Sequence, residues 1–334
     1  MIEKARKRHV WGWVCLIVLI VVGVAIFLNR DWIHDYYRGM TYQPSGEMAQ
    51  IRDDLDLTER GKFLFNAVQP ELDGAAEFNS YCREGGESEI AVLGCYTGGK
   101  IYIYNITDER LDGIRELTSA HELLHANWAR MSEGEKIALV EPLTRTFEAN
   151  QDMLGEEINT YETSQKQEEL YVRAGTEVKD LPEALEKHYG EIFKNQDKVV
   201  GYYESYISVF KALEKEMDEL QAEMKTMDDT LTAKMTEYEQ KLKQLNSDIT
   251  EFNKCAEQAG CFTSEYEFYA KRAILVAEQE ALNLMYEEIS GLVEAYNAKV
   301  EIYNADVLKS EKLNTVINST QKPQEIKQEE NERQ

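Results

Sequence analysis

The sequence has little positive charge, and this shortage limits the kinds of partner that the protein can bind. Among 334 residues, 37 Lys and Arg stand against 62 Asp and Glu, which gives a formal net charge of −25 at pH 7. Such a chain lacks the basic surface that holds a nucleic-acid backbone, so we expect no nucleic-acid partner. The hydrophobic fraction of 43% still suffices for a packed core, and the length allows about two domains.

Cysteines are also few, and no two of them have the close spacing of a structural zinc site. Cys15 lies alone in an apolar run. The other four form two local pairs, and an even number of cysteines is typical of an extracytoplasmic region. We therefore predict the disulfides Cys82–Cys95 and Cys255–Cys261.

An uncharged run extends from Val10 to Leu28, which is long enough for a helix to cross the hydrocarbon core of a bilayer. Basic residues precede the run, so the positive-inside rule predicts a cytoplasmic N-terminus and an extracytoplasmic location for the rest of a single-pass cell-membrane protein. Aromatic residues typical of membrane interfaces flank it: Trp11 and Trp13 before it, and Trp32, Tyr36 and Tyr37 after it. A cleaved signal peptide is the alternative, which the length of the run and the lack of a small-residue cleavage site disfavour.

The pattern along the chain predicts a mostly helical α+β protein in six segments. These are a cytoplasmic tail (1–9), a transmembrane helix (10–28), a juxtamembrane linker (29–50), a globular domain (51–198), a helical hairpin (199–318) and a disordered tail (319–334).

Within the globular domain, the sequence predicts a small antiparallel sheet between helices. The expected elements of the first half are a helix over 59–67, a loop over 73–88, and strands over 89–96 and 100–106 around the turn Thr97-Gly98-Gly99. They are followed by a helix over 109–131 capped by Thr107 or Asp108, a helix after the capping box at Ser132 with a kink or interruption at Pro142, a helix over 154–174 stopped by Gly175, and a short helix from Pro182 to Phe193.

The last third of the chain has a different pattern. Apolar residues alternate three- and four-residue steps from Ile207 to Phe252, with one extra step of four at Met235, and a second such run extends from Leu282 to Val307. This heptad pattern with a stutter predicts two helices that form an antiparallel coiled-coil hairpin, which can also self-associate. The predicted Cys255–Cys261 disulfide would close its tip.

One motif carries chemistry. In His121-Glu122-Leu123-Leu124-His125, the two histidines are four residues apart, so on a helix they share one face and can bind one metal ion. Glu122 would lie beside that ion, where it can take a proton from a metal-bound water. The same face carries apolar residues at helical spacing, so we expect it to be half-buried.

A strand over 100–106, a helix that carries this motif and a later acidic helix together resemble the zincin metallopeptidases of the gluzincin type. The resemblance covers roughly residues 100–175. It implies Zn²⁺ as cofactor, His121 and His125 as its first two ligands, Glu122 as general base, and a glutamate from the later helix as third ligand. Our choice for that ligand is Glu169, near the C-terminal end of its helix, with Glu162 and Glu168 as alternatives. Tyr171, His188 and Tyr189 are candidates for stabilising an oxyanion.

The function implied is a membrane-anchored, extracytoplasmic zinc metallopeptidase that hydrolyses peptide bonds with a zinc-activated water. Its partners would be a peptide or protein substrate and the membrane. The strand over 100–106 would offer an edge to an extended peptide. The alternative is a non-catalytic cell-surface scaffold, in which the coiled-coil hairpin binds proteins and the zincin-like domain is inactive.

Overall fold

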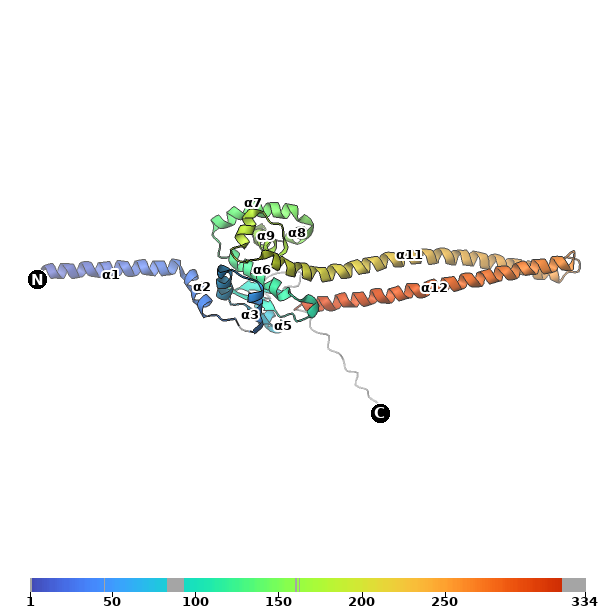
Figure 1. The fold of residues 1–334 in the computed structure, drawn as a ribbon, viewed down its shortest axis with the longest axis horizontal. Coiled ribbons are helices and arrows are strands. Elements are labelled where there is room, and N and C mark those ends of the chain that lie inside the picture. Colours follow the sequence, from blue (N-terminus) through green and yellow to red (C-terminus); the bar gives the residue numbers. More distant parts are fainter. Residues whose placement is uncertain (1, 45, 83–92, 160, 162, 320–334) are drawn as a thin grey trace, which may run out of the picture. The chain divides into compact units, whose positions relative to one another are not determined.

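The computed structural model describes residues 2–44, 46–82, 93–159, 161 and 163–319, and it is mostly helical with one three-stranded sheet (Figure 1). This confirms the predicted α+β class with a helical majority. The chain forms two compact units. The first comprises the residues up to Val209 together with those from Asn314 on, and the second runs from Phe210 to Leu313.

The elements of the first unit follow one another in this order: α1 (Ile2–Leu28), α2 (Arg30–Thr41), α3 (Gly46–Asp54), α4 (Glu59–Val68), β1 (Glu71–Asp73), α5 (Ala75–Cys82), β2 (Gly94–Thr97), β3 (Lys100–Tyr104), η1 (Glu109–Leu111), α6 (Ile114–Trp128), α7 (Glu133–Ala149), α8 (Gln151–Ile158), α9 (Thr163–Glu177) and α10 (Glu183–Tyr189). Two long helices follow, α11 (Gln196–Ala256) and α12 (Glu265–Ile317), which make up most of the second unit. The segment 29–50, expected to be a linker, thus contains α2 and the start of α3.

The sheet is mixed, so the prediction of an antiparallel sheet was wrong. Its order is β1-β3-β2, with β2 antiparallel and β1 parallel to the central strand β3. The segment 73–88 was expected to be a loop, but β1 ends in it and α5 follows. Parallel pairing with β3 joins residues about thirty apart through a connection that local sequence does not specify. The predicted strand over 89–96 is found as β2, and residues 83–92 lie outside the described ones.

The predicted helix over 109–131 is divided into η1 and α6. Asp108 caps the first of these, since its side chain accepts a hydrogen bond from the N–H of Arg110. Gly113 separates the two with a φ of +87°, and a Cβ there would lie 2.6 Å from a ring carbon of Tyr202. A glycine is therefore required both by the left-handed backbone and by the close approach of α11.

Downstream, the capping box at Ser132 is confirmed, because Ser132 and Glu135 satisfy each other's backbone N–H groups. Of the kink or interruption expected at Pro142, the interruption was wrong, since α7 runs through this residue. Pro142 lies on the buried face of α7, so tertiary packing maintains the helix despite the backbone hydrogen bond that a proline cannot donate.

The single helix predicted over 154–174 is two helices, α8 and α9. The stop expected at Gly175 was also wrong, since α9 continues to Glu177. Gly175 has a packing role: a Cβ on it would lie 2.5 Å from Cδ1 of Leu124 on α6 and 2.7 Å from the ring of Tyr189. The absence of a side chain therefore lets α9 approach α6 closely.

The hydrophobic core surrounds α6, which is buried along most of its length. Leu123 and Leu124 of α6 belong to one cluster with residues from α3, α4, β3 and α7 to α10 and from the segments that follow α3 and α10. These residues include Ile51, Leu55, Phe65, Ile101, Ile103, Leu143, Leu154, Tyr171, Leu185, Tyr189 and Phe193. The helix with the His-Glu-Leu-Leu-His motif is thus a central element, and its backbone is held from several sides.

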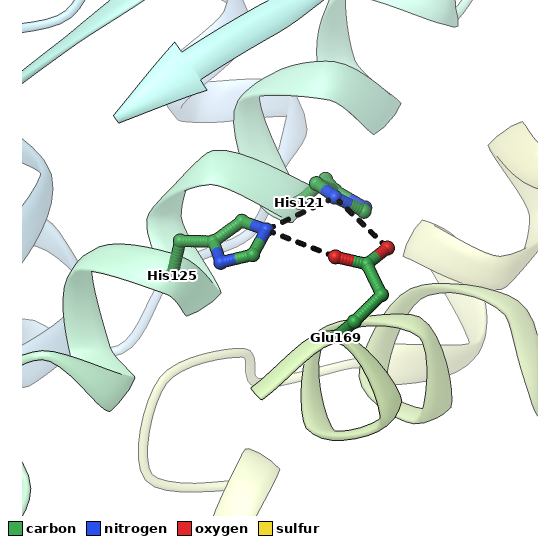
Figure 2. Close-up of side chains that lie close together, drawn as sticks. All are labelled: His121, His125 and Glu169. Atoms are coloured by element: carbon green, nitrogen blue, oxygen red, sulfur yellow. Dashed lines mark hydrogen bonds and ion pairs between the residues drawn. The ribbon is translucent and has the colours of Figure 1, made fainter. Parts of the chain in front are cut away.

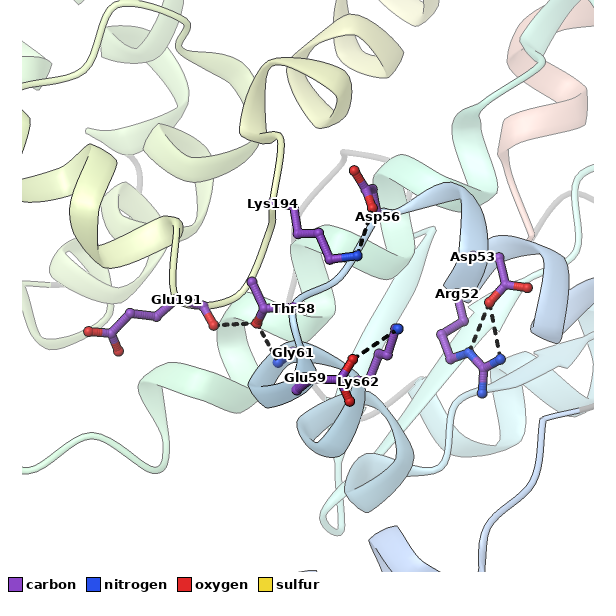
Figure 3. A network of polar contacts seen from close by, with 9 residues as sticks. All are labelled: Arg52, Asp53, Asp56, Thr58, Glu59, Gly61, Lys62, Glu191 and Lys194. Atoms are coloured by element: carbon purple, nitrogen blue, oxygen red, sulfur yellow. Dashed lines mark hydrogen bonds and ion pairs between the residues drawn. The ribbon is translucent and has the colours of Figure 1, made fainter.

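A polar clamp joins α4 to the segment after α10 (Figure 3). The Thr58 hydroxyl accepts a hydrogen bond from the N–H of Gly61 at 3.0 Å and donates one to the carbonyl of Glu191 at 2.6 Å. An isolated bridge pairs Leu57 with Phe193 beside it. The N-cap of α4 therefore also fixes a segment that is distant in sequence.

In the second unit, α11 and α12 lie side by side and run antiparallel (Figure 1). Gln221 donates to the hydroxyl of Tyr303 at 2.8 Å, and Nζ of Lys234 lies 2.7 Å from Glu288. Closer to the tip, the rings of Phe252 and Phe268 are 5.2 Å apart. Residue numbers increase along α11 while those of their contact partners on α12 decrease, as in an antiparallel hairpin.

The predicted stutter at Met235 has no counterpart in the burial pattern. Met235 is 50% exposed, whereas Lys234 is half-buried and continues the heptad spacing from Leu231 to Tyr238. A lysine can occupy this half-buried position between α11 and α12 because its aliphatic stem can pack while its ammonium group forms an ion pair with Glu288.

Both predicted disulfides are confirmed. Cys82–Cys95, with Cα atoms 5.8 Å apart, ties the end of α5 to β2 in the first unit. Cys255–Cys261, with Cα atoms 5.4 Å apart, closes the tip of the second unit.

For the described residues, no single helix meets the length and composition expected of a membrane span. The pair Leu16–Leu28 and Arg30–Thr41, bent by 67°, meets both together. The tail predicted to be disordered lies outside the described residues from residue 320 on.

Candidate metal centre

The two histidines of the motif point from one face of α6 toward the same spot, as the i, i+4 spacing predicts (Figure 2). Their Nε2 atoms are 3.3 Å apart. Both side chains are partly buried, with 27% of His121 and 20% of His125 exposed. The two Nε2 atoms therefore face one point beside α6, where both could bind the same ion.

Glu169 reaches this point from α9, on the opposite side of the site in Figure 2. Its Oε1 lies 3.8 Å from Nε2 of His121, and its Oε2 lies 3.5 Å from Nε2 of His125. The close packing of α9 on α6 at Gly175 brings the two helices into this range. The structure thus brings together the three residues that the sequence proposed as ligands.

The spacing of these atoms suits a metal ion. Two ligands of a tetrahedral zinc at about 2.0–2.1 Å are separated by about 3.3–3.5 Å, and the three separations here are 3.3, 3.5 and 3.8 Å. The three ligand atoms lie within 4.8 Å of one another. The group His121, His125 and Glu169 can therefore hold a metal ion with only a small adjustment of the side chains.

Glu168, an alternative for the third ligand, contacts the other ring nitrogen of His125. Its Oε1 lies 2.8 Å from Nδ1 of His125. A carboxylate there retains a proton on Nδ1 and leaves the lone pair of Nε2 free for a metal, as is common around metal-bound histidines. Glu162, the other alternative, lies outside the described residues.

The charges in the group are tightly coupled. Burial lowers the pKa of His121 to about 4. Burial alone would also lower that of His125, but hydrogen bonds to Glu168 and Glu169 raise its pKa to about 10. Burial likewise opposes ionisation of Glu169, yet the bond to His125 holds its pKa below the ordinary value. Without a metal, a proton on His125 therefore offsets the carboxylates, and a binding cation would replace that proton.

Glu122 faces the same region and is 7% exposed. Burial raises its pKa to about 7, and the negative charge of Glu169 adds to this effect, whereas the positive charge of His125 and the N–H of Tyr96 oppose it. A carboxylate with a pKa near neutrality is suited to accept and return a proton. Its environment is thus that of a general base.

Strand β2 lies directly over Glu122. A Cβ on Gly94 would be 2.6 Å from Cγ2 of Thr118 and 2.8 Å from Cγ of Glu122. The strand expected to offer an edge to a peptide, residues 100–106, is instead central, since β3 pairs on both sides. Among the described strands, β2 is the edge next to the motif helix.

The three candidates for stabilising an oxyanion bind one another away from the histidine pair. The Tyr171 hydroxyl accepts a hydrogen bond from Asn127 at 2.8 Å and lies 3.1 Å from Nε2 of His188. Tyr189 donates to the carbonyl of Tyr171 at 2.6 Å. Tyr171 and Tyr189 have no exposed surface. Tyr171 and Tyr189 thus belong to the core, and His188 is half-buried against Tyr171.

Sequence reasoning missed Arg173, which follows Glu169 by one helical turn. Its guanidinium is buried and forms two hydrogen bonds with Glu177, at 2.8 and 2.9 Å. Its positive charge lowers the pKa values of both His121 and Glu169. The i, i+4 spacing from Glu169 was the available signal.

Comparison with known proteins gives no match to a family model, a curated protein or a solved structure. The interpretation of this site therefore rests on its own geometry.

Proposed function

We propose that this chain is a membrane-anchored, extracytoplasmic zinc metallopeptidase. The observation that carries the proposal is the convergence of His121, His125 and Glu169 at separations that suit a tetrahedral ion, with Glu122 buried beside them. Two imidazoles and one carboxylate leave a fourth position open, which is typical of catalytic rather than structural zinc.

When bound, zinc would supply a Lewis acid that polarises a carbonyl and lowers the pKa of bound water. Glu122 accepts the proton of the attacking water and later delivers it to the leaving amine. Its pKa of about 7, raised by burial, allows both transfers near neutral pH. Glu168 holds the ring of His125 in the tautomer that presents Nε2.

The edge strand β2 would bind the substrate in extended form. Strand β3 pairs with one edge of β2, so a peptide would pair with the other edge. Because β2 approaches Glu122 closely at Gly94, that peptide would lie near the general base. The confirmed disulfides support a location in an oxidising compartment, and the apolar run Val10–Leu28 would be the anchor.

The test is metal analysis and peptide cleavage with the full chain in detergent. We expect one zinc per chain and cleavage of unstructured peptides by the parent protein, zinc without cleavage in Glu122→Gln, and neither in His121→Ala. Glu148→Gln, an exposed carboxylate on α7, is the matched control and should retain both.

Well-folded protein without bound zinc would refute the proposal. Zinc in both the parent and Glu122→Gln, with cleavage by neither, would replace it with a non-catalytic scaffold that works through the α11–α12 hairpin.

A further inference from the structure

Helix α2 docks onto the metal-binding unit by one face. Asp35 accepts two hydrogen bonds from Arg130, at 2.7 and 3.0 Å, and Nε of Arg38 donates to Gln69 at 3.3 Å. Gly39 lies against the ring of Phe63 on α4, where a Cβ would be 3.0 Å from Cε2. Polar and close-packed contacts thus fix the orientation of α2.

This orientation leaves a second face of α2 uncovered, and that face is apolar. Five residues at i, i+4 spacing form it: Trp32 (63% exposed), Ile33 (41%), Tyr36 (49%), Tyr37 (68%) and Met40 (66%). Phe63 of α4, 37% exposed, extends this aromatic face, since its ring lies 6.5 Å from that of Tyr36. An exposed apolar patch of this kind marks an interaction surface.

We infer that the aromatic face of α2 binds the interface of the lipid bilayer, so that the metal-binding unit lies directly on the membrane. The inference rests on the membrane anchor of the proposed function. One residue, Asn29, separates α2 from α1. The apolar side chains described between Val14 and Leu28 of α1 are exposed, so the lipid around this anchor is the apolar phase nearest to α2. Trp, Tyr and Met on one side of a short amphipathic helix suit the headgroup region.

Helix α2 itself is not expected to insert into the hydrocarbon core of the bilayer. The helix carries four charged residues and a histidine, and Asp35 and Arg38 are already hydrogen-bonded to the globular unit. Burying such groups in lipid tails costs several kcal/mol unless they are satisfied within the protein. The 67° bend after Leu28 therefore marks a turn from a spanning direction into the plane of the interface, rather than a broken span.

The docked helix also contacts the site through one residue. Arg130 donates to Asp35 of α2, to the hydroxyl of Tyr96 on β2 at 2.8 Å and to the carbonyl of Ala126 on α6 at 2.7 Å. Both the edge strand and the C-terminal turn of the motif helix are thereby tied to the membrane-facing helix. The site is held at a fixed place relative to the bilayer, which favours membrane-bound polypeptides as substrates.

The test is spin labelling of the full chain in lipid vesicles, in a Cys15→Ala background. Labels are placed at Tyr37→Cys and Met40→Cys on the aromatic face. Val18→Cys reports on the anchor, and Glu133→Cys, 86% exposed on α7, reports on water. Collisional relaxation by oxygen, which concentrates in lipid, and by a polar nickel complex measures the environment of each label.

We expect the oxygen-to-nickel ratio at positions 37 and 40 to shift from the value at position 133 toward that at position 18. Water-like ratios at 37 and 40, with a lipid-like ratio at 18, would overturn the inference and leave the anchor intact. Spin–spin broadening at 37 and 40 without oxygen access would also overturn it, because a second copy would then cover the face. Zinc content and cleavage, measured on the same sample, report separately on the proposed activity.

Discussion

The carboxylate of Glu168 lies 2.8 Å from Nδ1 of His125, while the neighbouring carboxylate of Glu169 faces Nε2 of the same ring at 3.5 Å. Two consecutive acidic residues on α9 therefore address the two nitrogens of one histidine. The first can orient the ring and the second can share its metal. A carboxylate on the second ring nitrogen is common around metal-bound histidines, so this arrangement supports the proposed metal site.

Replacing Glu168 with Gln should weaken metal binding without abolishing it. The three candidate ligands remain, but a neutral amide oxygen accepts the Nδ1–H bond of His125 more weakly than a carboxylate, so we expect zinc affinity to fall about 10–100-fold. Competition against a chromophoric chelator measures the change. Glu148→Gln should bind as tightly as the parent, and an unchanged affinity in Glu168→Gln would show that the Nδ1 contact has no part in metal binding.

The ligand set was predictable from sequence because two of its members lie on one helix. The spacing of His121 and His125 fixes their relation once α6 forms. Glu169 required knowledge of how α9 packs on α6, which local sequence does not contain. The interpretation of Gly175 as a helix stop was wrong for the same reason: the glycine is needed by its neighbours Leu124 and Tyr189, not by its own backbone.

Gly175→Ala should therefore destabilise the fold and weaken the metal site together. Its Cβ would meet Leu124 at 2.5 Å and Tyr189 at 2.7 Å, and overpacking of this kind typically costs about 1–3 kcal/mol. Movement of α9 away from α6 would also carry Glu169 from the histidines. Chemical denaturation and zinc titration measure the two effects.

Gly201→Ala is the matched control, since a Cβ there meets nothing within 4 Å on helix α11. It should stabilise the protein by about 0.5–1 kcal/mol, because alanine has less conformational entropy to lose than glycine. Equal stability of the two alanine variants would contradict the proposed packing role.

The sheet was the least predictable part of the fold. The hairpin of β2 and β3 follows from a local turn signal, but β1 joins by parallel pairing, and its three residues carry no distinctive pattern. Which strand forms the edge depends on this partner, so the expectation that residues 100–106 are the edge was wrong. The close approach of β2 to the motif helix rests on Gly94, whose significance appears only in three dimensions.

Gly94→Ala should reduce cleavage more than it reduces metal binding. The added methyl group would clash with Thr118 and with Cγ of Glu122, which displaces the proposed general base but touches none of the three candidate ligands. A displacement of about 1 Å can cost on the order of 10²-fold in rate. We expect kcat to fall with one zinc per chain retained. Gly134→Ala on α7, whose Cβ meets no atom within 4 Å, is the control and should change neither quantity. Loss of zinc in Gly94→Ala would contradict this assignment.

Zinc should stabilise the folded protein, because the ligands converge only in the native state. At one hundred times its Kd, a ligand that binds only the native state contributes about 2.7 kcal/mol, which corresponds to roughly 5–10 °C in Tm for a unit of this size. Chelation should reverse the shift. In His121→Ala the shift should be absent, and an equal shift in that variant would place the stabilising metal elsewhere.

Asp35→Asn should destabilise the docking of α2. Asp35 and Arg130 are 18% and 25% exposed, and their two hydrogen bonds join α2 to the segment that follows α6. Because hydrogen bonds to charged groups contribute about 1.5–3 kcal/mol, loss of the carboxylate should lower the unfolding free energy by an amount in this range. Asp31→Asn, 94% exposed on the same helix, should change it by less than about 0.5 kcal/mol.

In a double-mutant cycle, Asp35→Ala and Arg130→Ala should show a coupling energy of about 1 kcal/mol or more, since the two side chains are in direct contact. Strict additivity of the two changes would mean that the Asp35–Arg130 pair does not help to hold α2.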